Sequence, residues 1–319
     1  MRIVFCGTPE FAVPTLRGLL ANPEFAVAAV VTQPDRPRGR GQRVSVAAVK
    51  EVAADAAVRI YQPESVKSEE AHDFFAQIKP DAVVIIAYGQ IIPRRLLEIP
   101  RLGWMNLHAS LLPKYRGAAP IAWAIINGES KTGLTTMRLD PGLDTGPILR
   151  QREIAIGRDE TAPELAKRMA ELGAPLVVES LIKLERGEIA PIPQDSTQAS
   201  YAPILTKEQG RIDWSLTAGE IYNRIRGLAP WPGTFSTFRG RLCHIWGRPS
   251  APATTAGPAL KAIAQDAGTL IVSDAAIEVI CGNGTRLQLE AVQIEGRKRV
   301  SAREFVNGAR LGSAERFGV

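Results

Sequence analysis

The stretch Asp81-Ala82-Val83-Val84-Ile85-Ile86-Ala87-Tyr88-Gly89 is a continuous apolar run that ends in a glycine. A run of this length without polar alternation is typical of a parallel strand that is covered on both faces. Residues 2–6 and 27–31 read as two more strands joined by a helix over residues 11–20, and residues 103–108 read as the strand after the central run. This alternation predicts a Rossmann-like, doubly wound, mostly parallel sheet that binds ligands at the carboxyl ends of its strands.

The loop after the first strand lacks a dinucleotide-binding signature. Gly7 has no second glycine two residues later, so the G-x-G-x-x-G pattern that lets a backbone approach a pyrophosphate is missing. An oxidoreductase with a nicotinamide cofactor is therefore a poor second interpretation.

Three polar residues have the chemistry to move an acyl group between two nitrogens. Asn106 and His108 are two positions apart, so on an extended strand their side chains point to the same face and can donate to one oxyanion. Asp144 lies between Gly142 and Gly146, where the chain must bend, and its carboxylate can orient His108 or accept a proton from an amine. We predict that Asn106, His108 and Asp144 are catalytic. The alternative is structural, with the three side chains stabilising turns.

Two segments near Asn106 are candidates to bind a flat heterocycle. Ile86, Tyr88 and Gly89 end the central strand and can offer backbone groups and an aromatic wall, although Tyr88 is equally well explained as a core aromatic. The segment Ser110-Leu111-Leu112-Pro113 cannot continue a strand ladder past its proline, so we expect a fixed, partly apolar loop. A plain turn is the alternative for this loop.

A segment with four arginines in eight residues follows the second strand, namely Arg36, Arg38, Arg40 and Arg43. A proline and two glycines in the same segment argue against regular structure, and the charges repel one another unless an anion neutralises them. Guanidinium groups suit phosphate oxygens and base edges. We therefore predict that these arginines bind a nucleic acid, with an exposed, solvated loop as the alternative.

The composition of the 319 residues is that of an ordinary globular protein, with 45% hydrophobic and 23% charged residues and a formal charge of +6. Residues 207–319 hold 15 Lys and Arg against 10 Asp and Glu, whereas residues 1–206 hold 24 against 23. The surplus in the last third favours a polyanionic partner.

No apolar run is long enough for a membrane span, and the first strand breaks too early for a signal peptide. The three cysteines are far apart and there are only three histidines, which disfavours disulfides and a metal site and suits the cytoplasm. We expect no metal, no membrane partner and a monomer.

The chain divides by composition into two domains. Residues 1–189 form the first, and residues 190–206, a polar stretch with three prolines, read as a linker. Residues 207–319 hold five short strands with glycine turns, which predicts a small OB-like β-barrel of the kind that often binds nucleic acids. A basic cluster in this domain, Arg297, Lys298 and Arg299, is placed to contact phosphate.

Several motifs together carry a resemblance to a known family. The run from Asn106 to Pro113, with Arg116-Gly117-Ala118-Ala119-Pro120 and Leu143-Asp144-Thr145-Gly146, resembles the formyltransferases that use 10-formyltetrahydrofolate. The segments Phe5-Cys6-Gly7-Thr8-Pro9-Glu10-Phe11 and Thr32-Gln33-Pro34-Asp35-Arg36-Pro37 are similar to the branch that acts on methionyl-tRNA. The similarity extends over essentially the whole chain.

The resemblance implies transfer of a formyl group from 10-formyltetrahydrofolate to the amine of methionine on initiator tRNA. It implies that residues 110–113 line the folate pocket and that the arginine segment enters the acceptor arm of the tRNA. A formyltransferase with a small amine acceptor, such as glycinamide ribonucleotide or an amino-sugar nucleotide, would share the three predicted catalytic residues but would need neither basic segment. A non-enzymatic RNA-binding protein is a rival of another class, and folate-dependent turnover distinguishes it.

Overall fold

The computed structural model describes residues 1–38, 43–251, 267–273, 276–310 and 315–318. The chain forms two compact units. Unit 1 comprises Met1–Pro120, Lys131–Ala155 and Glu164–Pro203, and unit 2 comprises Ile121–Ser130, Ile156–Pro163 and Ile204–Val319.

These boundaries differ from the domains expected from composition. Residues 156–163 belong to unit 2, in which Arg226 donates to the carbonyls of Gly157 and Glu160, at 3.2 and 2.9 Å. Residues 190–203, which were expected to be linker, belong to unit 1.

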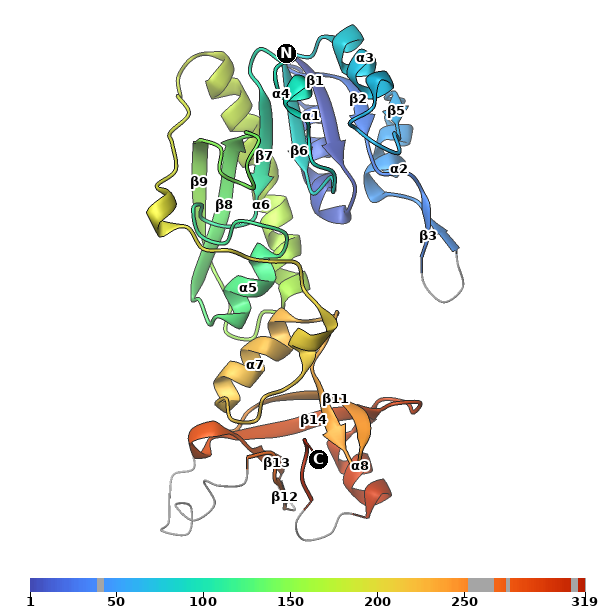
Figure 1. The fold of residues 1–319 in the computed structure, drawn as a ribbon, viewed down its shortest axis with the longest axis vertical. Coiled ribbons are helices and arrows are strands. Elements are labelled where there is room, and N and C mark those ends of the chain that lie inside the picture. The colour runs from blue at the N-terminus through green and yellow to red at the C-terminus, as the bar shows by residue number, and fades with distance from the viewer. Residues whose placement is uncertain (39–42, 252–266, 274–275, 311–314, 319) are drawn as a thin grey trace. The chain divides into compact units, whose positions relative to one another are not determined.

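Unit 1 contains a seven-stranded sheet (Figure 1). Its order is β5 (Ile60–Tyr61), β2 (Ala26–Val31), β1 (Arg2–Gly7), β6 (Ala82–Ile86), β7 (Trp104–His108), β8 (Lys131–Arg138) and β9 (Ile148–Ala155). The strands from β5 to β7 are parallel, and β8 and β9 are antiparallel to their neighbours. The prediction of a mostly parallel, Rossmann-like sheet is confirmed.

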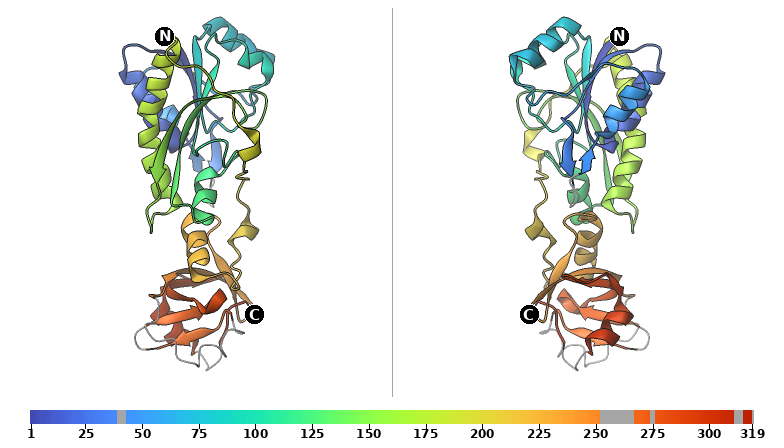
Figure 2. Two further views of the ribbon diagram at one scale, coloured as in Figure 1. Left: turned by 90° about the vertical axis from the view of Figure 1, so that its left-hand side faces the viewer. Right: turned by 90° about the vertical axis from the view of Figure 1, so that its right-hand side faces the viewer.

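Helices cover both faces of this sheet (Figure 2). They are α1 (Val13–Ala21), α2 (Ala48–Asp55), α3 (Glu69–Ile78), α4 (Arg94–Leu97) and α6 (Ala162–Glu185). On one face, Phe75 of α3 and Leu96 of α4 share a core with Val83 of β6. On the other face α6 packs closely on β7, since a Cβ on Gly173 would lie 2.4 Å from Leu107. Because both faces are covered, every residue of β6 is buried, which explains its apolar sequence.

Two elements of unit 1 differ from the sequence expectation. Strand β9 was not predicted, because its middle residues, Arg150 to Glu153, are polar and its pattern of burial is that of an edge strand. The expectation that the arginine segment lacks regular structure is wrong for its two ends. β3 (Arg36–Arg38) and β4 (Arg43–Ser45) pair as an antiparallel hairpin that projects from the sheet (Figure 1). Pro37 is tolerated there because a two-stranded ribbon has free edges. Arg40 lies outside the described residues.

Unit 2 contains a short helix, α5 (Pro120–Ile126), a longer helix, α7 (Ala218–Gly227), and an antiparallel sheet. The sheet runs β10 (Phe235–Phe238), β11 (Arg241–Pro249), β14 (Arg286–Ile294), β13 (Ile277–Ile280) and β12 (Leu270–Val272), and β15 (Val300–Ser301) pairs with β14. Phe317 bridges Phe238 of β10 and Arg316 bridges Thr269 beside β12, so the last residues join the two edges of the sheet. The expected five strands and the OB-like barrel are confirmed.

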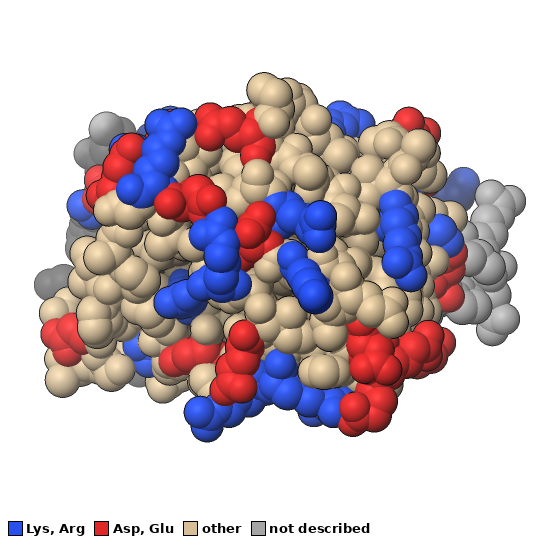
Figure 3. All heavy atoms as spheres, turned by 90° about the horizontal axis from the view of Figure 1, so that it is seen from above, with Lys and Arg blue, Asp and Glu red and all other residues tan. Residues whose placement is uncertain are grey.

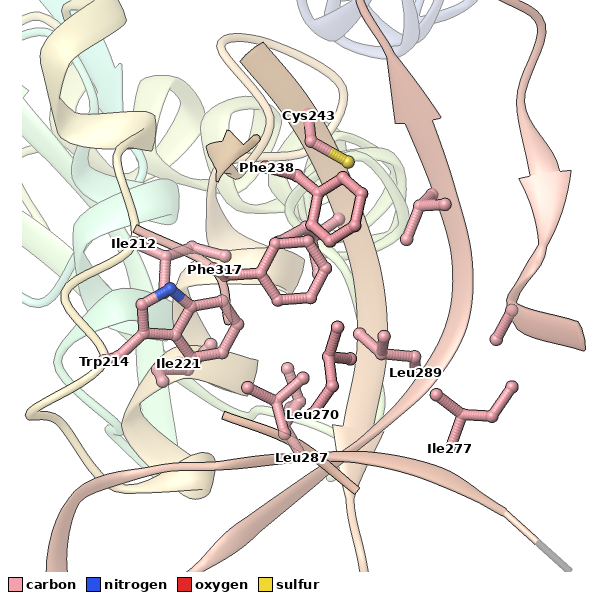
Figure 4. Close-up of a cluster of buried hydrophobic side chains, with 14 of the residues drawn as sticks. Ile212, Trp214, Ile221, Phe238, Cys243, Leu270, Ile277, Leu287, Leu289 and Phe317 are labelled. Carbon is pink, nitrogen blue, oxygen red and sulfur yellow. The ribbon is translucent and has the colours of Figure 1, made fainter. Parts of the chain in front are cut away.

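The core of the barrel is aromatic at one end (Figure 4). The rings of Trp214 and Phe317 stack with centroids 5.6 Å apart, and Phe238 lies 5.6 Å from Phe317. The last helix, α8 (Ala302–Ala309), begins with a capping box, in which Ser301 and Glu304 each accept a hydrogen bond from the other's backbone N–H.

None of the described helices is long and apolar enough to cross a membrane. On the face of the molecule shown in Figure 3, basic and acidic side chains are interspersed. This view therefore shows no large surface of one charge.

Candidate active site

Asn106 and His108 lie toward the carboxyl end of strand β7. Asn106 lies opposite Ile85 of β6 and Met137 of β8, in the middle of the sheet. Its side chain is half-buried, and no hydrogen bond ties it to another residue of the described ranges. The Asn106 carboxamide can therefore donate to a bound molecule without first breaking a bond within the protein.

His108 is 5% exposed, and a polar group of the protein lies close to each of its ring nitrogens. Nε2 lies 2.9 Å from the backbone oxygen of Tyr115, and because a carbonyl oxygen only accepts, Nε2 carries a proton. Nδ1 lies 3.6 Å from Oδ2 of Asp144, which is an ion-pair distance but too long for a hydrogen bond. Nδ1 is therefore the ring nitrogen that remains available to a reacting group, with a carboxylate beside it.

Asp144 is fixed through its carboxylate and through its backbone. Oδ2 accepts a hydrogen bond of 2.8 Å from the N–H of Gly117. The residue adopts a φ of 52°, a left-handed conformation that is uncommon for residues other than glycine. Gly146 follows, and a Cβ there would lie 1.9 Å from the backbone oxygen of Arg138, so no side chain fits. The structure thus brings His108 and Asp144 together across 36 residues of sequence.

The loop after β7 is held by hydrogen bonds to strands β8 and β9. Thr135 donates to the oxygen of Ser110 at 2.6 Å and accepts from the N–H of Leu112 at 3.1 Å. Gln151 donates to the oxygen of Leu112 at 2.8 Å. Ser110 and Leu112 are buried, whereas Leu111 and Pro113 are half-buried. Any contact of this loop with a heterocycle would therefore involve the side chains of Leu111 and Pro113.

The residues at the end of β6 contribute backbone rather than side chains. Ile86 is fully buried and Tyr88 is 2% exposed. The Tyr88 ring belongs to the core beside Phe75 and Trp104. This burial favours the core interpretation of the Tyr88 ring, and the role of Tyr88 in binding a heterocycle stays a prediction. Gly89 is exposed.

A pocket of about 680 Å³ lies at the carboxyl ends of β1, β2 and β6. It is lined by Thr8, Pro9, Glu10, Gln33, Pro34, Val46, Ala47, Ala48, Ala87, Tyr88 and Gly89. Val46 to Ala48 directly follow β4, so the base of the arginine hairpin forms one wall. Asn106, His108 and Asp144 do not line this pocket, although β6 and β7 are neighbouring strands.

A chain of hydrogen bonds ties the base of the hairpin to the pocket. Gln33 donates to the oxygen of Tyr88 at 3.1 Å, and Gln62 donates to the oxygen of Gln33 at 2.9 Å. Gln62 also donates to Asp35 at 3.1 Å, and Lys50 pairs with the same carboxylate. Asp35 directly precedes β3, so these bonds hold one end of the hairpin.

Hydrogen bonds from Lys50 and Gln62 hold the pKa of Asp35 below its ordinary value. A lowered pKa means that the charged form stabilises the fold at neutral pH and that this contribution is lost as pH falls through the lowered pKa, below about 3.9. Asp35→Asn should therefore lower the free energy of unfolding by about 0.5–1 kcal/mol near pH 7. The difference from the parent should shrink as urea unfolding is repeated toward about pH 3. Asp55→Asn, at an exposed position of α2, is the control, and an equal effect of both variants at every pH would contradict the prediction.

The basic cluster of unit 2 lies in the loop between β14 and β15. Arg297, Lys298 and Arg299 are exposed. The guanidinium of Arg299 lies 4.1 Å from the centroid of the Trp246 ring, a cation–π contact that holds it against the barrel.

Within the described residues, no group of three or more His, Cys, Asp or Glu side chains is arranged to hold a metal ion. All three cysteines are free and buried. Burial raises the pKa of Cys243 to about 11 and that of Cys281 to about 12, so neither thiol is ionised at neutral pH.

Residues that sequence reasoning did not assign to the site also hold it together. Tyr115 and Gly117 bind His108 and Asp144 through their backbones, and Gln194 binds the Asp144 loop. The resembling motif included residues 116–120, but backbone contacts leave no signal in residue type.

The model of the formyl transferase family matches residues 1–181, and that of the formyl transferase C-terminal domain matches residues 204–310. The chain belongs to the formyl transferase family. It is 50% identical to a methionyl-tRNA formyltransferase of Solibacter usitatus, over all of this chain and 99% of the relative. It is 47% identical to that of Koribacter versatilis, over all of this chain and 99% of the relative.

A solved structure is similar in fold to this chain. It is WlaRD, a sugar 3N-formyl transferase in the presence of dTDP and 5-N-formyl-THF, with a TM-score of 0.66 and 18% identity, and the match covers 93% of this chain and 99% of that one. At this identity the likeness concerns the fold alone.

Proposed function

We propose that this protein transfers the formyl group of 10-formyltetrahydrofolate to the amine of methionine on initiator tRNA, which yields N-formylmethionyl-tRNA for translation initiation. Relatives that are named methionyl-tRNA formyltransferase and match this chain over its full length support these substrates. The observation that carries the chemistry is the half-buried Asn106 carboxamide beside the His108–Asp144 pair, because these groups are suited to acyl transfer between nitrogens.

In the proposed reaction the neutral amine attacks the formyl carbon. A carbon–nitrogen bond forms, and the formyl oxygen becomes an oxyanion that accepts a hydrogen bond from Asn106. The N–H at Nδ1 of protonated His108 supplies a second donor or gives its proton to the folate nitrogen. Asp144 accepts the proton of the amine, directly or through water. The bond from the formyl carbon to the folate nitrogen breaks as that nitrogen takes a proton, either from His108 or, where His108 only donates a hydrogen bond, the proton that Asp144 received from the amine.

The folate donor is assigned to the edge between the loop after β7 and the end of β6. Leu111 and Pro113 offer half-buried apolar side chains, while Gly89 and its neighbours offer backbone groups. A flat heterocycle suits such a combination of apolar surface and a few fixed polar groups. Ile86, Tyr88, Ser110 and Leu112 then support the site from the interior.

Two basic segments are proposed to bind the tRNA. In unit 1 they are the arginines of the hairpin segment, Arg36, Arg38, Arg40 and Arg43. In unit 2 they are Arg297, Lys298 and Arg299, which are exposed. Arginine-rich ribbons bind phosphate mainly through charge and bidentate hydrogen bonds.

Replacing Arg38, Arg40 and Arg43 by glutamine should weaken tRNA binding and flatten its salt dependence. Each lost phosphate contact lowers the slope of log K against log salt by about 0.7–0.9, so three contacts lower it by about 2–3. Filter binding between about 50 and 200 mM salt measures the slope. Arg94, which is exposed, and Arg95, which is half-buried, are replaced in the same way on α4 as the control. An unchanged slope in the triple variant would remove the hairpin from the RNA contact.

One assay tests the function directly. The protein is incubated with 10-formyltetrahydrofolate and with methionyl-tRNA, initiator and elongator separately, and N-formylmethionine is measured after deacylation. Formylation of the initiator is expected. Turnover of an amino-sugar nucleotide or glycinamide ribonucleotide instead would favour the small-acceptor alternative, and absence of folate-dependent turnover would favour a binding protein.

We also propose a cytoplasmic location, which the three free cysteines support. The expectation of a monomer stays a prediction that sedimentation can test.

A further inference from the structure

The segment of residues 188–203, here called the strap, is fixed to unit 1 at two places. Ile192 and Ile148 exchange backbone hydrogen bonds of 2.8 and 2.7 Å at the edge of β9. Further along, the backbone N–H of Arg116 donates to the backbone oxygen of Ser200, and the backbone oxygen of Arg116 accepts from the N–H of Ala202, both at 2.8 Å. These bonds carry the strap across the loops of the candidate active site.

Between these two attachments, the side chain of Gln194 makes four hydrogen bonds. Its NH₂ group donates to the backbone oxygens of Asp144 and Gly146, at 2.8 and 2.7 Å. Its oxygen accepts from Nε and Nη2 of Arg116, at 3.1 and 2.8 Å. A primary amide has two N–H donors and an acceptor oxygen with two lone pairs, so this environment uses all of them. The two carbonyls on one side and the guanidinium on the other also fix which end of the amide is the oxygen.

Arg116 is 3% exposed and contacts no carboxylate within the described ranges. Its cation is instead held by the neutral amide of Gln194 and, at 3.4 Å, by the hydroxyl of Ser196. Burying an arginine without an ion-pair partner is costly. Its neighbours in sequence are the two residues whose backbones hold His108 and Asp144, namely Tyr115 and Gly117.

The loop that Gln194 holds adopts a strained conformation. Asp144 has a φ of 52°, and such a conformation persists only where surrounding contacts enforce it. The Gly117 N–H fixes the carboxylate and Gln194 fixes the carbonyls of residues 144 and 146. The position of the carboxylate near His108 therefore depends on contacts from two distant segments.

We propose that Gln194 and Arg116 are positioning residues, which together set the place of the Asp144 carboxylate relative to His108. The inference rests on the proposed function. Loss of the amide donors frees the carbonyls of the loop, and the carboxylate moves away from the reacting atoms while the binding surfaces for folate and tRNA remain.

The substitution that separates positioning from simple stabilisation is Gln194→Glu. A glutamate keeps the size of the side chain and pairs with Arg116, but it has no N–H to donate to the two carbonyls. We expect kcat to fall about 10- to 100-fold, as for a misplacement of about 1 Å, with KM for both substrates near the parent value. Gln194→Met, which removes both sets of bonds, should lower kcat at least as much and also lower the unfolding midpoint.

Gln198→Met is the matched control, because Gln198 is exposed on the same strap and bonds only to Asp195 among the described residues. It should keep the kcat of the parent. The variants are compared by steady-state kinetics with each substrate varied and by thermal unfolding. If Gln194→Glu does not fold, Gln194→Met is compared with Gln198→Met instead.

A parent-like kcat in folded Gln194→Glu would overturn the inference and leave the proposed function standing. A loss of kcat that matches the loss of folded protein in every variant would also overturn the inference, because the two residues would then act only on stability. If the parent itself formylates no methionyl-tRNA, the proposed function fails and the inference fails with it.

Discussion

Replacing Asn106 with alanine should lower kcat about 100- to 1,000-fold while tRNA binding stays intact. The loss of one oxyanion donor costs on the order of 2.7–4 kcal/mol of transition-state stabilisation. The side chain is half-buried and makes no hydrogen bond to the described residues, so its removal disturbs little of the fold. Because the hydrogen bond strengthens only as charge develops, kcat and kcat/KM should fall together.

Two further variants make this result specific. Asn106→Asp keeps the shape of the side chain but replaces a donor with an anion, so its turnover should be at least as low as that of the alanine variant. Asn22→Ala removes an asparagine that bonds to the N–H of Glu24 in a turn after α1, and it should keep the parent turnover. Near-normal kcat in folded Asn106→Ala would refute the proposed role.

Replacing Asp144 with asparagine should lower kcat about 100- to 10,000-fold, the range of general acid–base catalysis. The amide oxygen of an asparagine can still accept from the N–H of Gly117, so the loop can keep its conformation. The variant lacks the negative charge 3.6 Å from Nδ1 of His108 and cannot take the proton of the amine. Single-turnover kinetics with saturating substrates measures the chemical step directly.

Asp140 offers a comparison within the same loop. Its carboxylate accepts from the hydroxyl of Thr145 and from the N–H of Gly142, so it supports the turn without facing His108. Asp140→Asn should cost far less turnover than Asp144→Asn. Equal losses in the two variants would mean that the loop, and not the Asp144 charge, matters for turnover.

Local patterns in the sequence were sufficient for much of the fold. The apolar run of residues 82–86 is buried throughout because helices cover both faces of the sheet, and that burial demands apolar residues. The five strands of unit 2 were also predicted, since short strands separated by glycine turns are short-range signals. Strand β9 was not predicted because its exposed residues are polar. The hairpin was not predicted because proline and glycine indicate turns more strongly than they indicate short ribbons.

For the candidate site, the sequence alone determined that Asn106 and His108 share a face, because side chains on a strand alternate with a period of two. It did not determine what holds them. Gln194 lies 50 residues from Asp144 and 78 from Arg116, in a stretch whose prolines and polar residues read as a linker. Only the tertiary structure brings these residues together, because hydrogen bonds between distant segments follow from how the chain packs and leave no periodic pattern in its sequence.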